Sequence, residues 1–333
     1  MTFERTGRTS LTPTINQPTT STYAQSLELA SKIIALADLS RVPALCELDS
    51  ILFISAFESG SAGAYLVETK NFTSPVVLKI LTETDFLLHT NEEIFSFRAR
   101  LAAMYREIHT LMTIPPHPNI VGHPVALVTV RCVDSPAVCG FLSPFHPGGT
   151  IACALNPLPP GSEPPSLARR IRWANQMVSA IHHLHRVANT YHGDIKLDNV
   201  VLSTDDDAVF IDFEQGRHAE QCLAPEAHGS WDVISNIPAA GSSIGAPAPA
   251  TIRYVRYTGP DRGDTWSAYE AWAKYPEVME AMEVYSLGDA LQTLFEGTIP
   301  PSTIGSIVDR CLLEDPAARP RLDLIRTALK HST

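Results

Sequence analysis

One stretch of the chain, residues 191–216, decides how the rest is interpreted: YHGDIKLDNVVLSTDDDAVFIDFEQG. It holds two acids on short polar segments, Asp194 and Asp212, 18 residues apart. Each acid adjoins an apolar run of strand character, 200–202 after the first and 208–211 before the second. Because a tight pair of strands brings its flanking loops together, the pattern predicts a hairpin that aims both acids into one cleft.

The polar groups of this stretch suit phosphoryl transfer from a nucleotide. Asp194 would orient the attacking hydroxyl and accept its proton. Asp212 and the amide of Asn199 would hold the metal ion that bridges the phosphates, and Lys196 would stabilise charge on the transferring group. The alternative is a turn-rich hairpin whose acids, including the DDD run at 205–207, are solvated.

The same stretch resembles the catalytic and metal-binding loops of the protein-kinase-like superfamily. HGDIKLDN at 192–199 is similar to H-R-D-L-K-x-x-N, with Gly193 in place of the usual Arg. The run from Asp212 to Glu214 is similar to D-F-G, with Glu214 in place of the Gly. The resemblance implies that Asp194 and Lys196 are catalytic, that Asn199 and Asp212 bind Mg²⁺, and that ATP is the nucleotide.

The composition is that of an ordinary soluble chain, with 333 residues, 44% of them hydrophobic and 8% aromatic. The net charge of −11 argues against general binding to nucleic acid or to an acidic membrane. The sequence has no apolar run long enough to span a bilayer, and its N-terminus lacks the basic-then-apolar order of a secretory signal. Six cysteines without a C-x-x-C pair indicate reduced thiols, and therefore a cytoplasmic or nuclear protein.

The first part of the chain is predicted to lie outside the catalytic domain. Residues 1–22 are rich in Ser and Thr and poor in large apolar side chains, which predicts a disordered tail. Apolar residues at helical spacing over 26–39 predict an amphipathic helix that packs on the next lobe. We therefore assign residues 23–45 to an N-terminal helical extension; a partner-binding helix is the alternative.

A strand, a glycine-containing turn and a second strand are predicted at 51–57, 58–63 and 65–68. Glycine lets backbone N–H groups approach phosphates closely, so Gly60 and Gly63 are candidate nucleotide-binding residues. The turn resembles the kinase motif G-x-G-x-x-G, with Glu58 at the first glycine position.

Lys79 is embedded in an apolar strand, 75–80, where a lysine either protects an exposed sheet edge or has a buried partner. The strand resembles the V-A-I-K strand of kinases, whose Lys holds the nucleotide phosphates and pairs with a helix Glu. We place that helix at 92–113 and take Glu107 as the partner. Glu92 and Glu93, near the helix start, are the alternatives.

Prolines from residue 115 onward must end that helix. The run HPNIV at 117–121 resembles the connector found at this point in protein kinases and favours that branch over the small-molecule kinases. Strands at 125–133 and 137–142 are expected to complete a five-stranded antiparallel sheet. Residues 143–149 are similar to the hinge between kinase lobes, which implies that His146 supplies a backbone donor to the adenine of ATP.

The second half of the chain is predicted to be mainly helical. A proline-rich loop at 155–166 precedes an amphipathic helix at 167–187. The helix ends in IHHLH, and its histidines invite a metal interpretation. We prefer an ordinary helix flank, because an L-H pair recurs just before the catalytic loop across the kinase family.

Further motifs follow an irregular segment that reaches about residue 266. EVYSLG at 283–288 resembles D-V-W-S-L-G, the start of the buried helix that supports the catalytic loop. DPAARP at 315–320 resembles the late D-P-x-x-R-P motif. The short distance from Glu283 to Arg319 predicts that helix G of the kinase fold is reduced or absent. The stretch 270–288 also resembles kinase-like proteins of filamentous fungi.

The partner of Arg319 has two candidates in the sequence. Glu226 belongs to an Ala-Pro-Glu run that mimics the kinase A-P-E motif, but it lies only 12 residues after Glu214. We therefore expect Glu277, in Tyr-Pro-Glu, to be the equivalent acid and to pair with Arg319.

The resemblance covers about residues 51–329 and implies an α+β protein with the bilobed kinase fold. The expected single kinase domain spans about 46–330, with a small lobe at 46–143, made of the sheet and helix C, and a mainly helical lobe at 144–333. The implied activity is transfer of the ATP γ-phosphate to a protein hydroxyl by a monomeric Ser/Thr kinase. The lysine two residues after Asp194 favours Ser/Thr over Tyr as the acceptor, and the missing Arg at Gly193 predicts activity that does not depend on activation-segment phosphorylation.

Two alternatives remain open. A small-molecule kinase of the aminoglycoside or choline type, acting on a small alcohol, is suggested by H-G-D and I-D-F-E and opposed by Lys196 and HPNIV. A pseudokinase scaffold is suggested by Glu58 and Glu214, which place negative charge near the phosphates and the metal.

Overall fold

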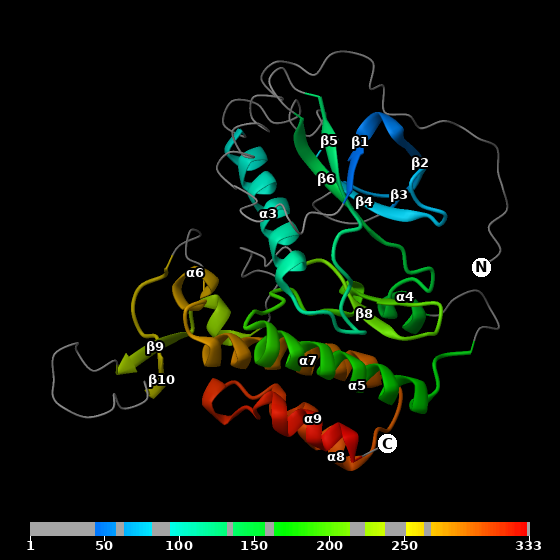
Figure 1. Cartoon of the computed structure of the whole chain (residues 1–333). Helices are drawn as coiled ribbons and strands as arrows, with labels where there is room; N and C mark the ends of the chain where they lie inside the picture. Colours follow the sequence, from blue (N-terminus) through cyan, green and yellow to red (C-terminus); the bar gives the residue numbers. More distant parts are fainter. Residues whose placement is uncertain are drawn as a thin grey trace. The chain divides into compact units, whose positions relative to one another are not determined.

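The computed structural model describes residues 44–57, 63–81, 94–131, 136–156, 163–213, 224–236, 251–262 and 268–331, which form an α+β structure (Figure 1). The chain divides into two units. Unit 1 comprises Met1–Met112 and Gly122–Phe145, and unit 2 comprises Thr113–Val121 and His146–Thr333. The predicted N-terminal tail, the helix at 26–39, Gly60 and both atypical acids of the kinase motifs, Glu58 and Glu214, lie outside the described residues.

Unit 1 is built on a six-stranded mixed sheet with the strand order β1-β5-β6-β4-β3-β2. The expectation of five antiparallel strands is wrong, because β1 adds a sixth strand that pairs in parallel with β5. A four-residue strand shows too little alternation to be distinguished from the end of the expected helical extension. The strands are β1 (Ala44–Glu47), β2 (Ile51–Ala56), β3 (Gly63–Thr69), β4 (Val76–Ile80), β5 (Ala126–Val130) and β6 (Ala137–Pro144).

The order of the strands requires this sheet to curl. β1 and β2 are its two edges, yet only the single turn Leu48–Ser50 joins them. In a flat sheet the edges of six strands would lie about 24 Å apart. The connection from Glu47 to Ile51 spans at most about 14 Å. The sheet therefore bends until its edges approach each other. By the strand order, β4 and β6 lie at its centre.

The long helix of unit 1, α3 (Ile94–Thr113), confirms the helix expected at 92–113 within the described residues. Its buried side chains recur at helical spacing: Leu101, Met104, Tyr105, Ile108 and Leu111. The Tyr105 hydroxyl donates to the Val138 carbonyl of β6 at 3.0 Å, which fixes the helix against the sheet. The helix ends where prolines 115 and 116 follow.

Unit 2 is organised around two helices, α5 (Leu167–His183) and α7 (Pro276–Phe295). The Ser166 hydroxyl caps α5 by accepting the Arg169 N–H at 3.3 Å, and a single π turn, Leu184–Ala188, continues the helix, so the expected helix at 167–187 is confirmed. α7 begins at Pro276, seven residues before the predicted start at Glu283. Most of its residues are buried, which is typical of a central helix.

The remaining elements of unit 2 surround these helices. The predicted hairpin is confirmed as β7 (Val200–Leu202) and β8 (Ala208–Phe210). The segment expected to be irregular contains a 3₁₀ turn, Pro225–His228, and a second hairpin, β9 (Trp231–Asn236) and β10 (Thr251–Arg256). Short helices complete the unit: α4 (Ile151–Leu155), α6 (Ala268–Trp272), α8 (Ser302–Cys311) and α9 (Leu322–Lys330). The structure describes every residue between α7 and Arg319. This stretch contains the helix α8 and a 3₁₀ turn, Pro316–Ala318.

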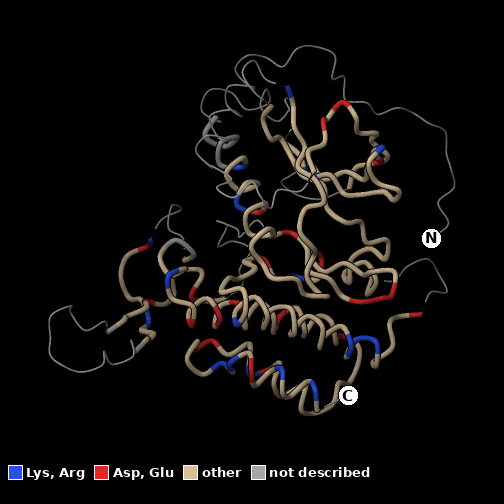
Figure 2. The backbone as a smooth tube through the Cα atoms, viewed as in Figure 1, with Lys and Arg blue, Asp and Glu red and all other residues tan. Residues whose placement is uncertain are grey.

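Basic and acidic residues both occur along the helices of unit 2, as the colours of the backbone in Figure 2 show. In the turn between β7 and β8, Asp206 is bound by Arg169 and Arg172 of α5, and the Gln176 Nε2 donates to Asp207 at 2.5 Å. The expectation of a solvated acidic run therefore holds for the exposed Asp205 and is wrong for Asp206 and Asp207. Over the described part of the chain, no helix combines the length and the apolar character needed to cross a membrane.

Candidate functional site

The β7–β8 hairpin positions the two acids of the predicted site. Asp194 lies on the segment that leads into β7, and Asp212 follows β8. The Ile211 N–H donates to the Asn199 carbonyl at 3.0 Å, so the chain just before Asp212 is held against Asn199. The HPNIV segment supports the hairpin, because the Asn119 amide donates to the Ala208 carbonyl at 2.9 Å.

Asp194 is the centre of a cluster of three predicted site residues. Its Oδ2 accepts from the Lys196 ammonium at 2.7 Å and from the Asn199 amide at 2.8 Å. The Asn199 amide also donates to the Asp194 carbonyl at 2.9 Å. The other carboxylate oxygen, Oδ1, is buried and has no hydrogen-bond partner among the described residues. One oxygen of the acid is thus fixed by two donors, and the other is not committed to any group that the structure describes.

His192 fixes the backbone on either side of this cluster. Its Nδ1 accepts the Asp194 N–H at 3.2 Å, and its Nε2 lies 2.9 Å from the Ile211 carbonyl. Because a carbonyl only accepts, Nε2 carries the proton and the ring is the neutral Nε2–H tautomer. The imidazole packs against the Phe213 ring, with the centroids 4.7 Å apart. A single side chain therefore links the segments that carry the two acids.

Glu283 of α7 is a buried carboxylate that binds the backbone just before Asp194. Its Oε1 accepts the N–H groups of His192 and Gly193, both at 2.7 Å. Its Oε2 lies 2.6 Å from the Nε2 of His185, and the side chains of both residues are almost fully buried. Burial, the largest single influence, would raise the pKa of Glu283, but the interactions with His185 and His192 and the hydrogen bond from the Gly193 N–H together outweigh it and lower the pKa. The carboxylate is therefore ionised and can accept every bond offered to it.

Two residues of the site have positive φ angles. Gly193 has φ 88°, a region that side chains rarely adopt, which accounts for glycine where the kinase motif has Arg. Asp212 has φ 67°, a conformation that Asp tolerates better than most residues. Non-glycine residues held in this region are concentrated at functional sites.

Lys79 and Glu107 form the predicted pair within unit 1. The ammonium donates to both carboxylate oxygens of Glu107 at 2.9 Å. The Lys79 side chain is 18% exposed and that of Glu107 only 3%. Because β4 lies between β3 and β6, Lys79 does not protect a sheet edge, and that alternative is wrong.

The other predicted nucleotide-binding residues are less informative. Gly63 begins β3, and a Cβ at this position would come within 2.9 Å of the Tyr65 ring. His146 follows β6 and is half-buried, and this burial lowers its pKa. Their roles toward a nucleotide, like that of Gly60, stay predictions.

The expected partner of Arg319 is wrong. Arg319 pairs with Glu226 through two hydrogen bonds of 2.5 and 2.8 Å, and both side chains are 0% exposed. Glu277 is exposed at the start of α7. The 3₁₀ turn Pro225–His228 directs Glu226 inward, and the β9–β10 hairpin occupies the chain between this turn and α7. The β9–β10 hairpin therefore follows the Ala-Pro-Glu run that pairs with Arg319. The choice of Glu277 had assumed that the long irregular segment comes before the acid that pairs with Arg319.

The histidines at the end of α5 bind separate partners. His182 lies 2.7 Å from Asp323, His183 2.8 Å from the Pro115 carbonyl, and His185 contacts Glu283. Among the described residues no group of three or more His, Cys, Asp or Glu side chains is placed to hold a metal ion.

A comparison with models of known protein families found no match, and a search among curated proteins found no relative. The geometry of the two units therefore carries the functional argument.

Proposed function

We propose that this protein is an ATP-dependent phosphotransferase that transfers the γ-phosphate to a Ser or Thr hydroxyl of a protein. The observation that carries the proposal is the state of Asp194. Its Oδ2 is held by Lys196 and Asn199, and its buried Oδ1 has no partner. An oriented carboxylate with one oxygen that is not committed to another group can align a hydroxyl nucleophile and accept its proton once the substrate is bound.

The neighbouring groups have roles that fit the same chemistry. Lys196 is half-exposed beside Asp194, so its ammonium can follow charge that develops on a transferring phosphate. Lys79, held by Glu107, is the cation that we assign to the nucleotide phosphates in unit 1. The buried network of Glu283 and His192 keeps the Asp194 segment in place without touching the reacting atoms.

The donor set of Asn199 and Asp212 fits Mg²⁺, which prefers amide and carboxylate oxygens together with water and phosphate. The Asn199 amide nitrogen is occupied by Asp194, so its oxygen is the atom that would serve as ligand. When bound, the ion would neutralise charge on the phosphates. Buried polar atoms are rarely left without a hydrogen-bond partner, so the unpartnered Asp194 Oδ1 also supports binding of a polar ligand group at this site.

The Glu226–Arg319 pair favours a protein substrate over the small-molecule alternative. The Ala-Pro-Glu run and the DPAARP run are motifs that resemble those of protein kinases, and the structure joins their Glu and Arg. The experiment is transfer of labelled phosphate from Mg-ATP, with generic protein acceptors tested beside a panel of small alcohols. We expect label on protein. Label on small alcohols alone would support the small-molecule alternative, and failure of ATP to label or stabilise the protein would support the scaffold.

A further inference from the structure

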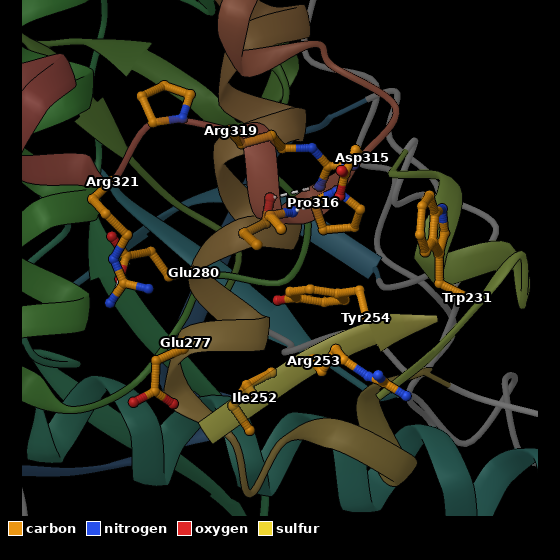
Figure 3. A pocket seen from close by; sticks show the side chains of 13 residues that line it. Trp231, Ile252, Arg253, Tyr254, Glu277, Glu280, Asp315, Pro316, Arg319 and Arg321 are labelled. Atoms are coloured by element: carbon orange, nitrogen blue, oxygen red, sulfur yellow. Dashed lines mark hydrogen bonds and ion pairs between the residues drawn. The ribbon is translucent and has the colours of Figure 1, made fainter. Parts of the chain in front are cut away.

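The β9–β10 hairpin of unit 2 has one edge that faces a groove. The groove has a volume of about 440 Å³ and is formed by β10, by Trp231 of β9, by α7 and by the segment 315–321 (Figure 3). Three consecutive residues of β10 line it: Ile252, Arg253 and Tyr254. Side chains alternate along a strand, and Figure 3 shows those of Arg253 and Tyr254 pointing in opposite directions. A run of three lining residues therefore means that the backbone edge of β10 borders the groove.

The register of the hairpin identifies the backbone groups at this edge. The Tyr257 N–H donates to the Ser230 carbonyl at 3.0 Å, which makes these two residues a hydrogen-bonded pair of the ladder. Such pairs alternate with non-bonded pairs in an antiparallel ladder. Ile252 opposes Ser235 and Tyr254 opposes Val233, so both belong to the non-bonded set. Their N–H and C=O groups point away from β9, toward the groove.

No further strand of the described chain pairs with this edge, since the sheet consists of β10 and β9 alone. The hairpin is nevertheless firmly anchored. Ile252 and Tyr254 pack on the buried cluster that includes Val278, Met279 and Met282 of α7. The Ser235 hydroxyl also lies 3.0 Å from the Tyr275 hydroxyl. A fixed strand with unused donors and acceptors is a template for an added strand.

The charged residues that line the groove indicate which kind of peptide it would bind. Arg319 and Arg321 are neutralised by Glu226 and Glu280. In the part of the chain that the structure describes, the lining charges without an ion pair are Glu277, Asp315 and Arg253, two negative and one positive. Tyr254 and Pro316 supply apolar surface between the two acids (Figure 3). This arrangement suits a short apolar segment flanked by basic residues.

We propose that this groove binds an extended peptide segment of a partner protein, with basic residues near Glu277 and Asp315, as a third strand on β10. The segment would use the N–H and C=O groups of Ile252 and Tyr254 for backbone hydrogen bonds. The proposal concerns binding and holds whether or not the chain transfers phosphate.

The test begins with selection of binders from a displayed library of random decapeptides against the full-length protein. We expect enriched sequences with Lys or Arg around a short apolar core. One enriched peptide is then synthesised, and each central residue is N-methylated in turn. Methylation should weaken binding tenfold or more at every second residue and have little effect between them, because only alternate N–H groups face β10. Failure to enrich any peptide, or a scan without this period of two, would overturn the proposal.

Variants of the protein provide the second arm. Ile252→Pro removes the N–H that faces the groove but no bond to β9, and it should abolish binding that Ile252→Val retains. Glu277→Lys should weaken a basic peptide about tenfold, whereas Asp309→Lys, an exposed acid outside the groove, should not. Equal binding by Ile252→Pro and Ile252→Val would contradict the assignment. So would a concentration-dependent dimer that Ile252→Pro disrupts, since the occupant would then be a second copy of this chain.

Discussion

Glu226 and Arg319, 93 residues apart in the sequence, form an ion pair from which solvent is fully excluded. Arg319 also donates to the carbonyls of Leu313, Ala281 and Glu314 at 2.8, 2.9 and 3.3 Å, so all its N–H groups are engaged. The pair joins the Ala-Pro-Glu turn to the loop after α8 and thereby closes unit 2 around α7.

Removal of one member of this pair should destabilise the protein strongly. Glu226→Ala leaves a buried guanidinium without its counter-charge, and we expect a loss of about 3–5 kcal/mol in the free energy of unfolding. Glu277→Ala, at the exposed acid that the sequence had suggested as partner, should change it by less than about 0.5 kcal/mol. Urea unfolding of the two variants checks the assignment, and equal effects would contradict it.

Glu283 is predicted to be a positioning residue for the Asp194 segment. Glu283→Ala leaves the buried N–H groups of His192 and Gly193 without acceptors, and we expect a loss of about 3–5 kcal/mol of stability. Glu283→Gln keeps the shape but adds a donor opposite His185, so it should lose less stability while still lowering kcat. Unfolding and phosphate transfer measured together separate the two effects. A Glu283→Gln variant with unchanged kcat would count against a positioning role.

Gly193 is predicted to resist conversion to the usual kinase sequence. Its φ of 88° disfavours any side chain, so Gly193→Ala should cost about 1 kcal/mol or more. Gly193→Arg should be at least as destabilising and should not create dependence on phosphorylation. Thermal unfolding of both variants provides the measurement. A stability of Gly193→Arg equal to that of the wild type would show that the segment adopts another conformation.

His117 should make stability depend on pH. Burial, His183 and Arg326 lower its pKa from 6.5 to about 4, and its Nδ1 accepts the Asn119 N–H, which requires a neutral ring. As the pH drops from 6.5 toward 4, His117 becomes protonated in the unfolded chain but stays neutral in the folded protein. The free energy of unfolding therefore falls over this range. Relative to His117→Gln, the wild type should have its largest advantage at pH 7 and progressively lose it at lower pH. A difference between the two proteins that stays constant from pH 7 to pH 4.5 would contradict this account.

The sequence was informative wherever the pattern is local. Helical spacing predicts α3 and α5, and two apolar runs around an acidic turn predict β7 and β8. The Lys79–Glu107 pair was implied by the resemblance to the lysine strand and the following helix of kinases. The partner of Arg319 was missed because a long-range pair depends on the path of the chain between its members. The spacing of residues does not reveal that the β9–β10 hairpin follows Glu226. β9 and β10 are rich in β-branched and aromatic residues, and that signal could have identified them. β1 is too short to carry such a signal.

The central claim concerns Asp194, and one measurement tests it most directly. Single-turnover transfer of phosphate from Mg-ATP to a protein acceptor is compared between the wild type and Asp194→Asn, with thermal unfolding as a check on folding. Asn has the same shape but cannot take up the hydroxyl proton, so the account predicts a rate lower by about 10²–10⁴-fold with stability little changed. Equal transfer rates in the two proteins would contradict the role assigned to Asp194.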